Sequence, residues 1–329
     1  MNRRDSVAAL VALFAAGEPL IALAQRQEKL RRIGYLVMPP LTDKPSPERA
    51  ALLEGLRALG YIEGRNLKIE YRSAEMEADF VPDLAAELIN AGVELIFAAD
   101  TSVVSAILKI SSTIPIVFVS IADPVEMKFA HSLARPGKNV TGITLLGVSL
   151  APKALELLRG LLPAAKRVAV LRGTGGTGVA GEWAALKSAA EKLGFALDFF
   201  SVRNAAELSH QLQRIAVAKP DALFVTTDQR TIAARRIIAN FALAQRLPSV
   251  MGFSGYTLAG GLFSLATDFA EQFGRAATYV DKILKGAKPG ELAIEQPTTF
   301  ELVVNLKTAR TLGITVPQLL LIRANRVIE

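Results

Sequence analysis

The chain has 329 residues, of which 51% are hydrophobic and 21% are charged. This composition is typical of a globular protein with one large core or two lobes of about 120 to 150 residues each. The formal net charge is +7, but lysines and arginines are scattered, so no nucleic-acid partner is expected. The absence of cysteine excludes disulfides, thiolate metal sites and a lipid-modified cysteine, and two histidines make a zinc site unexpected.

The first 24 residues have the layout of a secretory signal peptide. Arg3 and Arg4 form a basic start, residues 7–16 are apolar, and Ala22-Leu23-Ala24 is a small-residue cleavage site. The apolar run is too short to cross a bilayer as a helix. We expect removal of residues 1–24 on export by the Sec or the twin-arginine route, leaving a soluble periplasmic protein without stable membrane insertion. A buried N-terminal helix is the alternative.

Beyond the signal, β-rich apolar runs alternate with helical patterns. The expected strands are 32–37, 66–72, 93–99 and 114–119, and the expected helices are 48–59 and 78–90. Near-continuous apolar runs are typical of parallel strands that are buried on both faces. This first part is therefore predicted to be a doubly wound α/β unit.

The same alternation restarts after expected turns at Gly137 and Gly142. The second set comprises helices 149–162, 180–193, 205–218 and 231–243 and strands 167–171, 195–202 and 221–226. A long helix 268–285, a linker 286–297, a strand 300–304 and a short helical tail complete the chain. The predicted fold is α/β, with two doubly wound Rossmann-like lobes joined by a hinge. The lobes are 30–144 plus about 268–298, and 145–267 plus about 299–329.

Catalytic motifs are scarce. The sequence has no Gly-x-Ser-x-Gly elbow, no His-Glu-x-x-His motif and no phosphate-binding loop with a lysine, so we expect no catalytic residues and no cofactor. Residues 173–178 nevertheless fit Gly-x-Gly-x-x-Gly, and Asp198 follows at the distance of a ribose-binding acid. A nucleotide-cofactor enzyme is therefore one alternative. The other interpretation is a cleft loop, including Thr174, whose glycines allow close approach to a ligand.

Polar residues follow several expected strands at the point where each strand ends. They are Asp100-Thr101-Ser102, Ser120 with Asp123, and Asp228 in the second lobe. Open α/β sheets bind ligands at the carboxyl ends of their strands, so these clusters are expected to converge on one crevice. Hydroxyls and a helix N-terminus suit a carboxylate, and Asp100 or Asp228 suits an ammonium group. Simple helix capping is the alternative role.

The loop 251–256 is rich in glycine and carries two aromatic residues. Gly252 permits close backbone approach, and the rings of Phe253 and Tyr256 can cover a flat ligand. Packing of these rings beneath the loop is the alternative.

Several ordered motifs resemble the ABC transporter substrate-binding proteins related to tryptophan- and tyrosine-binding proteins. These motifs are residues 32–36, 59–66, 114–119, 122–125, 133–142, 276–289 and 296–309. The resemblance implies a type I periplasmic-binding-protein fold and delivery of a small-molecule ligand to a membrane permease. It implies ligand contacts at Met38, Asp100, Thr101, Ser102, Ser120, Asp123, Asp228, Gly252 and Phe253. The chain departs from the family at residues 172–175, where relatives commonly have Asn-Pro, and at Asp100, where relatives often have a small residue.

The proposed mechanism is closure of a hinge over a small molecule such as an aromatic amino acid. A ligand-sensing module for a signalling receptor is a second alternative that the residues do not separate from a transport component. A sugar-type repressor core shares the fold, but no DNA-binding headpiece precedes residue 31, and the signal peptide argues against a cytoplasmic regulator.

Overall fold

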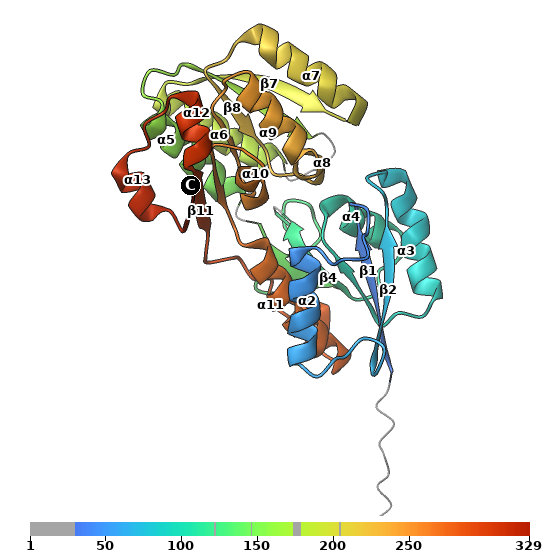
Figure 1. Cartoon of the computed structure of the whole chain (residues 1–329). Coiled ribbons are helices and arrows are strands. Elements are labelled where there is room, and N and C mark those ends of the chain that lie inside the picture. The colour runs from blue at the N-terminus through green and yellow to red at the C-terminus, as the bar shows by residue number, and fades with distance from the viewer. Residues whose placement is uncertain (1–29, 122, 146, 174–178, 204) are drawn as a thin grey trace, which may run out of the picture. The chain divides into compact units, whose positions relative to one another are not determined.

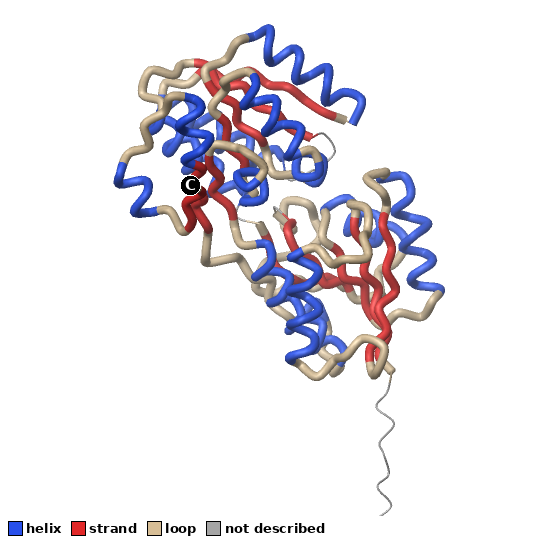
Figure 2. Tube along the Cα trace, viewed as in Figure 1, coloured by secondary structure: helices blue, strands red, loops and turns tan. Residues whose placement is uncertain are grey.

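The structure is a computed structural model that describes residues 30–121, 123–145, 147–173, 179–203 and 205–329 (Figure 1). The chain divides into two units, residues 1–30 and 31–329, and the helices and strands below belong to the second. The predicted signal peptide and the loop 174–178 lie outside the described residues. Figure 2 shows two groups of strands, each flanked by helices.

The first sheet is parallel throughout. Its strands are β1 (Arg31–Val37), β2 (Leu67–Ser73), β3 (Leu95–Ala98), β4 (Ile116–Ile121) and β5 (Val140–Thr144). They are ordered β2-β1-β3-β4-β5. All four residues of β3 are fully buried, as expected for an apolar strand in the middle of a sheet that is covered on both faces.

Helices cover both faces of this sheet. One face packs against α2 (Pro47–Ala58) and α11 (Phe269–Leu284), and the other packs against α3 (Val81–Asn90) and α4 (Thr101–Ile110), with the short 3₁₀ helix η1 (Ala78–Phe80) before α3. The two helices of the first face touch closely, because a Cβ at Gly55 would lie only 2.6 Å from the carbonyl oxygen of Gly274. We call this sheet and its helices the first lobe.

The prediction of a turn at Gly142 is wrong, since this residue lies inside β5. Its φ is +148°, and a Cβ there would lie 1.9 Å from the carbonyl oxygen of Phe118 on the neighbouring strand. Only glycine allows β5 to pair with β4 at this position. The strand escaped prediction because it is short and combines this glycine with two threonines.

The second sheet has seven strands. They are β6 (Arg167–Gly173), β7 (Ala196–Val202), β8 (Ala222–Val225), β9 (Ser249–Met251), β10 (Phe263–Ala266), β11 (Glu301–Asn305) and β12 (Arg326–Ile328). Their order is β12-β11-β10-β9-β8-β6-β7, and all neighbours are parallel except the pair β10 and β11. The sequence did not predict β10 and β12, which are short.

Helices also cover both faces of the second sheet, and together they form the second lobe. One core contains α5 (Gly147–Leu161), α6 (Val179–Leu193), α12 (Leu306–Leu312) and α13 (Gln318–Arg323), and the other contains α7 (Ala205–Ala218), α9 (Arg235–Ala244) and α10 (Ser254–Leu258). The single helix predicted over 231–243 is wrong. Asp228 caps a separate short helix α8 (Gln229–Ala233), and Ala234 separates it from α9.

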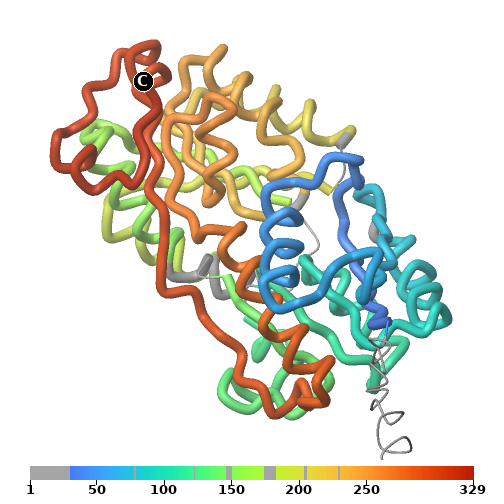
Figure 3. The backbone as a smooth tube through the Cα atoms, turned by 60° about the horizontal axis from the view of Figure 1, so that its bottom comes forward, coloured from blue at the N-terminus to red at the C-terminus, as the bar shows by residue number. Residues whose placement is uncertain are grey.

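The chain passes between the two lobes at three places in its described part: from β5 to α5, from β10 to α11, and from the 3₁₀ helix η2 (Pro289–Glu291) to β11 (Figure 3). Glu295 joins these crossings. Its backbone oxygen accepts the Thr144 N–H at 2.9 Å, and its carboxylate pairs with Arg275. The Thr299 hydroxyl donates to the Glu271 carboxylate at 2.8 Å. The connecting segments are therefore bonded to one another.

Candidate functional site

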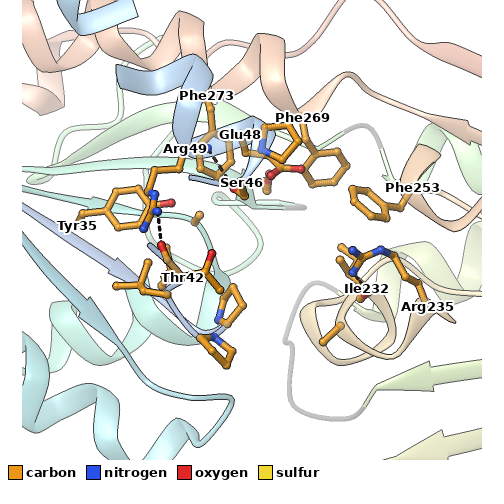
Figure 4. Close-up of a pocket in the computed structure, with 18 residues that line it drawn as sticks. Tyr35, Thr42, Ser46, Glu48, Arg49, Ile232, Arg235, Phe253, Phe269 and Phe273 are labelled. Carbon is orange, nitrogen blue, oxygen red and sulfur yellow. Dashed lines mark hydrogen bonds between the residues drawn. The ribbon is translucent and has the colours of Figure 1, made fainter. Parts of the chain in front are cut away.

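A cavity of about 300 Å³ is lined by side chains from both lobes (Figure 4). Most of the lining is apolar or aromatic, as in small-molecule sites generally. The first lobe contributes Tyr35, Val37, Pro39, Pro40, Leu41, Thr42, Ser46, Pro47, Glu48, Arg49, Ala99, Ser120, Phe269 and Phe273. The second lobe contributes Ile232, Ala233, Arg235 and Phe253.

The ends of three parallel strands place the first-lobe wall. Val37 ends β1, Ala99 follows β3, and Ser120 lies near the end of β4. The carboxyl ends of parallel strands share one edge of a sheet, which is why the sequence pointed to this edge. The start of α2 returns to the same edge, because the Ser46 hydroxyl accepts the Arg49 N–H at 3.2 Å and Pro47 occupies the first turn.

Ser120 combines backbone strain with an unpaired hydroxyl. Its φ is +63°, and the pairing of β4 with β5 shifts register between Val119 and Ile121. Its hydroxyl oxygen is buried and has no hydrogen-bond partner among the described residues. The left-handed conformation costs a non-glycine residue about 1–2 kcal/mol, and an unpaired buried hydroxyl adds to that cost. Such costs are typical of functional sites, where a ligand can satisfy the free group.

Aromatic rings form much of the remaining wall. Phe253 and Phe269 meet edge to face with ring centroids 5.4 Å apart, and the Arg235 guanidinium lies 5.8 Å from the Phe253 centroid. On the first-lobe wall, the Tyr35 ring stacks on the Phe97 ring with centroids 5.4 Å apart. A flat apolar ligand can therefore pack against rings from both lobes.

Tyr256 does not share this role. Its side chain is fully buried in the second lobe, and its hydroxyl lies 2.7 Å from the Ser249 hydroxyl. Of the two roles left open by the sequence, Tyr256 therefore has the packing role beneath the loop. The short helix α10 turns its ring inward, while Phe253, just before that helix, lines the cavity.

Tyr35 and Arg49 are polar groups on the first-lobe wall. Arg49 is buried, donates to the Thr42 carbonyl oxygen at 2.5 Å and lies over the Tyr71 ring. Burial raises the pKa of the Tyr35 hydroxyl, while the positive charge of Arg49 lowers this pKa and the negative charge of Glu48 raises it. Tyr35 therefore stays protonated and offers a hydrogen-bond donor at the cavity.

Asp100 caps α4 and does not line the cavity. Its carboxylate accepts the Ser102 N–H at 2.7 Å and also the Ser102 hydroxyl. Burial raises the pKa of Asp100, the two Ser102 hydrogen bonds lower it, and the nearby charge of Asp228 raises it. Thr101 and Ser102 are half-buried, and neither belongs to the lining, whereas the preceding Ala99 does.

Asp228 is held even more firmly by its own lobe. It accepts hydrogen bonds from the backbone N–H groups of Gly173 at 2.8 Å, Arg230 at 3.0 Å and Thr231 at 3.2 Å, and from the Thr226 hydroxyl at 3.2 Å. The structure thus brings Asp100 and Asp228 close enough for their charges to interact, as expected of converging strand ends. Each carboxylate is already bound to its own loop.

The other predicted contacts lie beside the lining residues or apart from them. Met38 is buried in the first-lobe core, next to Pro39. The Asp123 carboxylate accepts the N–H groups of Val125 and Glu126, each at 2.9 Å. Gly252 precedes Phe253, and a Cβ there would lie 2.3 Å from the Thr227 hydroxyl oxygen. Thr174 lies outside the described residues.

Two contacts disfavour the nucleotide alternative. The N–H of Gly173, the first glycine of the pattern, donates to the Asp228 carboxylate, whose negative charge opposes a phosphate at that place. Asp198 pairs with Arg167 at 2.7 Å. Arg167 begins β6 and Gly173 ends it, so the acid lies toward the opposite end of the strand from Gly173.

Sequence reasoning missed several lining residues, above all Glu48 and Arg235. Glu48 was the first residue of the helix expected over 48–59, and Arg235 lay within the helix expected over 231–243. The proline turn after the first strand was the available signal, because loops after parallel strands build such sites. No comparable signal distinguishes Arg235 from its neighbour Arg236, which is exposed.

The described residues lack both a metal-binding cluster and a membrane-spanning helix. They contain no group of three or more His, Cys, Asp or Glu side chains that is placed to hold a metal ion. They also contain no helix with the length and apolar character needed to cross a membrane.

The two sheets and the cavity between their strand ends define a two-lobed α/β protein of the periplasmic-binding-protein class. The sequence profile of the family described as ABC transporter substrate binding protein matches residues 43–328. The chain belongs to this family, which confirms the resemblance of its motifs.

Known relatives agree with this assignment. The chain is 25% identical to a tyrosine-binding protein of Clostridioides difficile over 288 residues, which cover 87% of this chain and 81% of the relative. A crystal structure of a conserved domain protein from Vibrio cholerae matches with a TM-score of 0.85 and 29% identity, over 91% of this chain and all of that one. A Streptococcus pneumoniae ABC domain in complex with L-Trp matches with a TM-score of 0.83 and 24% identity, over 91% and 99% of the two chains.

Proposed function

We propose that the protein is the exported substrate-binding component of an ABC uptake transporter. It captures a small molecule in the cavity by closure of the two lobes and presents it to a membrane permease from the periplasm. Family membership supports the transport role, and the basic start, apolar run and small-residue site of residues 1–24 support export. The lobes in this proposal are 30–144 with about 268–298, and 145–267 with about 299–329.

One observation carries the proposal: a single cavity has walls from both lobes and contains an unpaired buried hydroxyl. Ser120 stands on the first-lobe wall and Phe253 on the second-lobe wall, so a bound molecule touches both lobes at once. A ligand that contacts both lobes favours the closed arrangement by its differential affinity.

The proposed ligand is a small molecule such as an aromatic amino acid. The rings of Phe253, Phe269 and Tyr35 support an aromatic or apolar body, and relatives named for tyrosine and solved with L-Trp support the same class. Ser120 and Phe253 are the proposed direct contacts. The other proposed contacts are Met38, Asp100, Thr101, Ser102, Asp123, Thr174, Asp228 and Gly252.

A thermal-shift screen of amino acids, nucleobases and related metabolites tests ligand capture. At about 100 times Kd, binding stabilises the protein by roughly 2.7 kcal/mol, which raises Tm by several degrees. Calorimetry and solution scattering of each hit then measure affinity and compaction. The proposal is wrong if no compound raises Tm, releases heat or compacts the protein.

Export has a separate test. We expect the periplasmic fraction of an expressing bacterium to contain a processed chain that begins at Gln25, as measured by N-terminal sequencing. An intact N-terminus on a cytoplasmic product contradicts this part of the proposal.

A further inference from the structure

Two side chains of opposite charge line the cavity, and neither has a partner of opposite charge within the described part of the chain. Glu48 lies in the first turn of α2, and Arg235 is the first residue of α9. Among the described residues, the Glu48 side chain has no ion pair and no hydrogen bond. Arg235 Nη1 donates a hydrogen bond to the Ile232 carbonyl oxygen at 3.0 Å, which leaves its charge without an ionic partner among the described residues. Figure 4 shows Glu48 on the first-lobe wall and Arg235 on the second-lobe wall, beside Phe253.

The other charged groups around the cavity are already engaged. Asp100 and Asp228 cap helices and accept hydrogen bonds from their own loops. Arg49 lines the cavity too, but it is buried, donates to the Thr42 carbonyl oxygen and stacks over Tyr71. Glu48 is therefore the carboxylate of the described lining that is free to bind a cation.

Unpaired charges on a largely apolar wall are unfavourable unless a group of opposite charge or a hydrogen-bonding partner binds them. Removing a charge from water is costly, so half-buried charges are normally paired or hydrogen-bonded. The guanidinium of Arg235 is also positioned by the Phe253 ring beneath it, which leaves its planar fork available for a carboxylate. One wall thus presents a free anion, and the other presents a free cation.

We infer that Glu48 and Arg235 determine the charge specificity of the site, with Glu48 binding the cationic group and Arg235 binding the anionic group of a zwitterionic ligand. This inference rests on the proposed function and replaces Asp100 and Asp228 as the ammonium-binding residues. Because each lobe holds one of the two charges, a ligand that carries both charges links the lobes. A ligand with one charge leaves the other residue unpaired as the cavity closes.

Matched ligand triplets test the inference in wild-type protein. Each triplet contains a zwitterion, the acid without its amine and the amine without its carboxylate. The triplets are L-tryptophan, indole-3-propionate and tryptamine; L-phenylalanine, 3-phenylpropionate and phenethylamine; and L-leucine, 4-methylpentanoate and 3-methylbutylamine. We expect the zwitterion of the best-binding triplet to have a Kd at least about 10-fold lower than either analogue, measured by calorimetry.

Two variants then assign the charges to residues. Arg235→Gln is expected to lower the affinity for the zwitterion and for the acid by about 10- to 100-fold and to leave the affinity for the amine unchanged. Glu48→Gln is expected to lower the affinity for the zwitterion and for the amine by a similar factor and to leave the affinity for the acid unchanged. The controls are Glu54→Gln on the same helix, whose side chain is exposed and pairs with Arg57, and Arg236→Gln, which is exposed and outside the lining. Neither control should change any of the three affinities.

The outcomes separate this inference from the proposed function. Equal weakening of zwitterion, acid and amine by both variants indicates a direct ion pair between Glu48 and Arg235 and overturns the assignment. Unchanged affinities in both variants, or a wild-type protein that prefers an acid, an amine or an uncharged compound, also overturn it while ligand capture stands. If no compound of the triplets or of the wider screen binds, the proposed function itself fails.

Discussion

Two pairs of charged residues near the cavity differ in what they already bind. The first pair is Asp100 and Asp228, and the second pair is Glu48 and Arg235. The aspartates follow strands and cap the next helix, so backbone N–H groups occupy their oxygens. Glu48 is the second residue of α2 and Arg235 is the first residue of α9, and their charged ends reach the cavity without an ionic partner among the described residues. A polar residue at a strand end can therefore serve as a helix cap without lining the cavity.

The largest expected effect is the destabilisation caused by Asp228→Ala. This change removes the cap of α8, leaves the Gly173 N–H without its carboxylate acceptor and leaves the Thr226 hydroxyl with the Leu171 carbonyl oxygen at 3.4 Å. We expect the free energy of unfolding to fall by about 2–4 kcal/mol, measured by urea denaturation. Asp228→Asn keeps one acceptor oxygen and should lose less. A fully stable Asp228→Ala protein that no longer binds ligand would instead make Asp228 a ligand-binding group and break the comparison.

Ser120→Ala is expected to act in the opposite direction on stability. It removes a buried hydroxyl that has no partner among the described residues, so the ligand-free protein should gain about 1 kcal/mol. Ser264→Ala is the matched control, because that hydroxyl is also buried and unpaired but lies in the second-lobe core. Both variants should have a higher Tm than wild type. Only Ser120→Ala should lower the affinity for a ligand found in the screen. Equal ligand affinity in the two variants would remove Ser120 from the site.

Asp100→Asn sharpens the comparison through pH. Burial raises the pKa of Asp100 in the folded protein, so the folded state binds more protons than the unfolded state between the ordinary and the raised pKa. Stability therefore falls as the pH rises through this interval. We expect Asp100→Asn to have a higher Tm than wild type at pH 7, with the difference vanishing below about pH 4, the ordinary value for aspartate. A Tm difference that is independent of pH contradicts this explanation.

The smallest expected effect is the change in stability on Glu48→Gln or Arg235→Gln. Neither side chain has an ionic partner among the described residues, so the free energy of unfolding without ligand should change by less than about 0.5 kcal/mol. Chemical denaturation of both variants measures this directly. A loss above about 1 kcal/mol would show that these side chains already stabilise the ligand-free fold, as Asp228 is expected to do.

Local patterns were sufficient for most of the elements and for the edge of the sheet that carries the cavity. Apolar runs such as Leu95–Ala98 mark buried parallel strands, and Ser120 and Phe253, both chosen from strand-end loops, do line the cavity. Failures occurred where a contact distant in sequence decides the local structure. Gly142 belongs to a strand because the backbone of Phe118 on the neighbouring strand lies against it. The Tyr256 ring turns inward, where its hydroxyl donates a hydrogen bond to the Ser249 hydroxyl.

The sequence by itself determined the α/β alternation, the family and the strand ends that border the cavity, because these depend on hydrophobic periodicity and short motifs. Only the tertiary structure decided which polar groups remain free. Glu48 and Arg235 are 187 positions apart in the chain. Whether a side chain is capped by its own loop or left facing a cavity depends on packing between distant segments, and no local pattern records that.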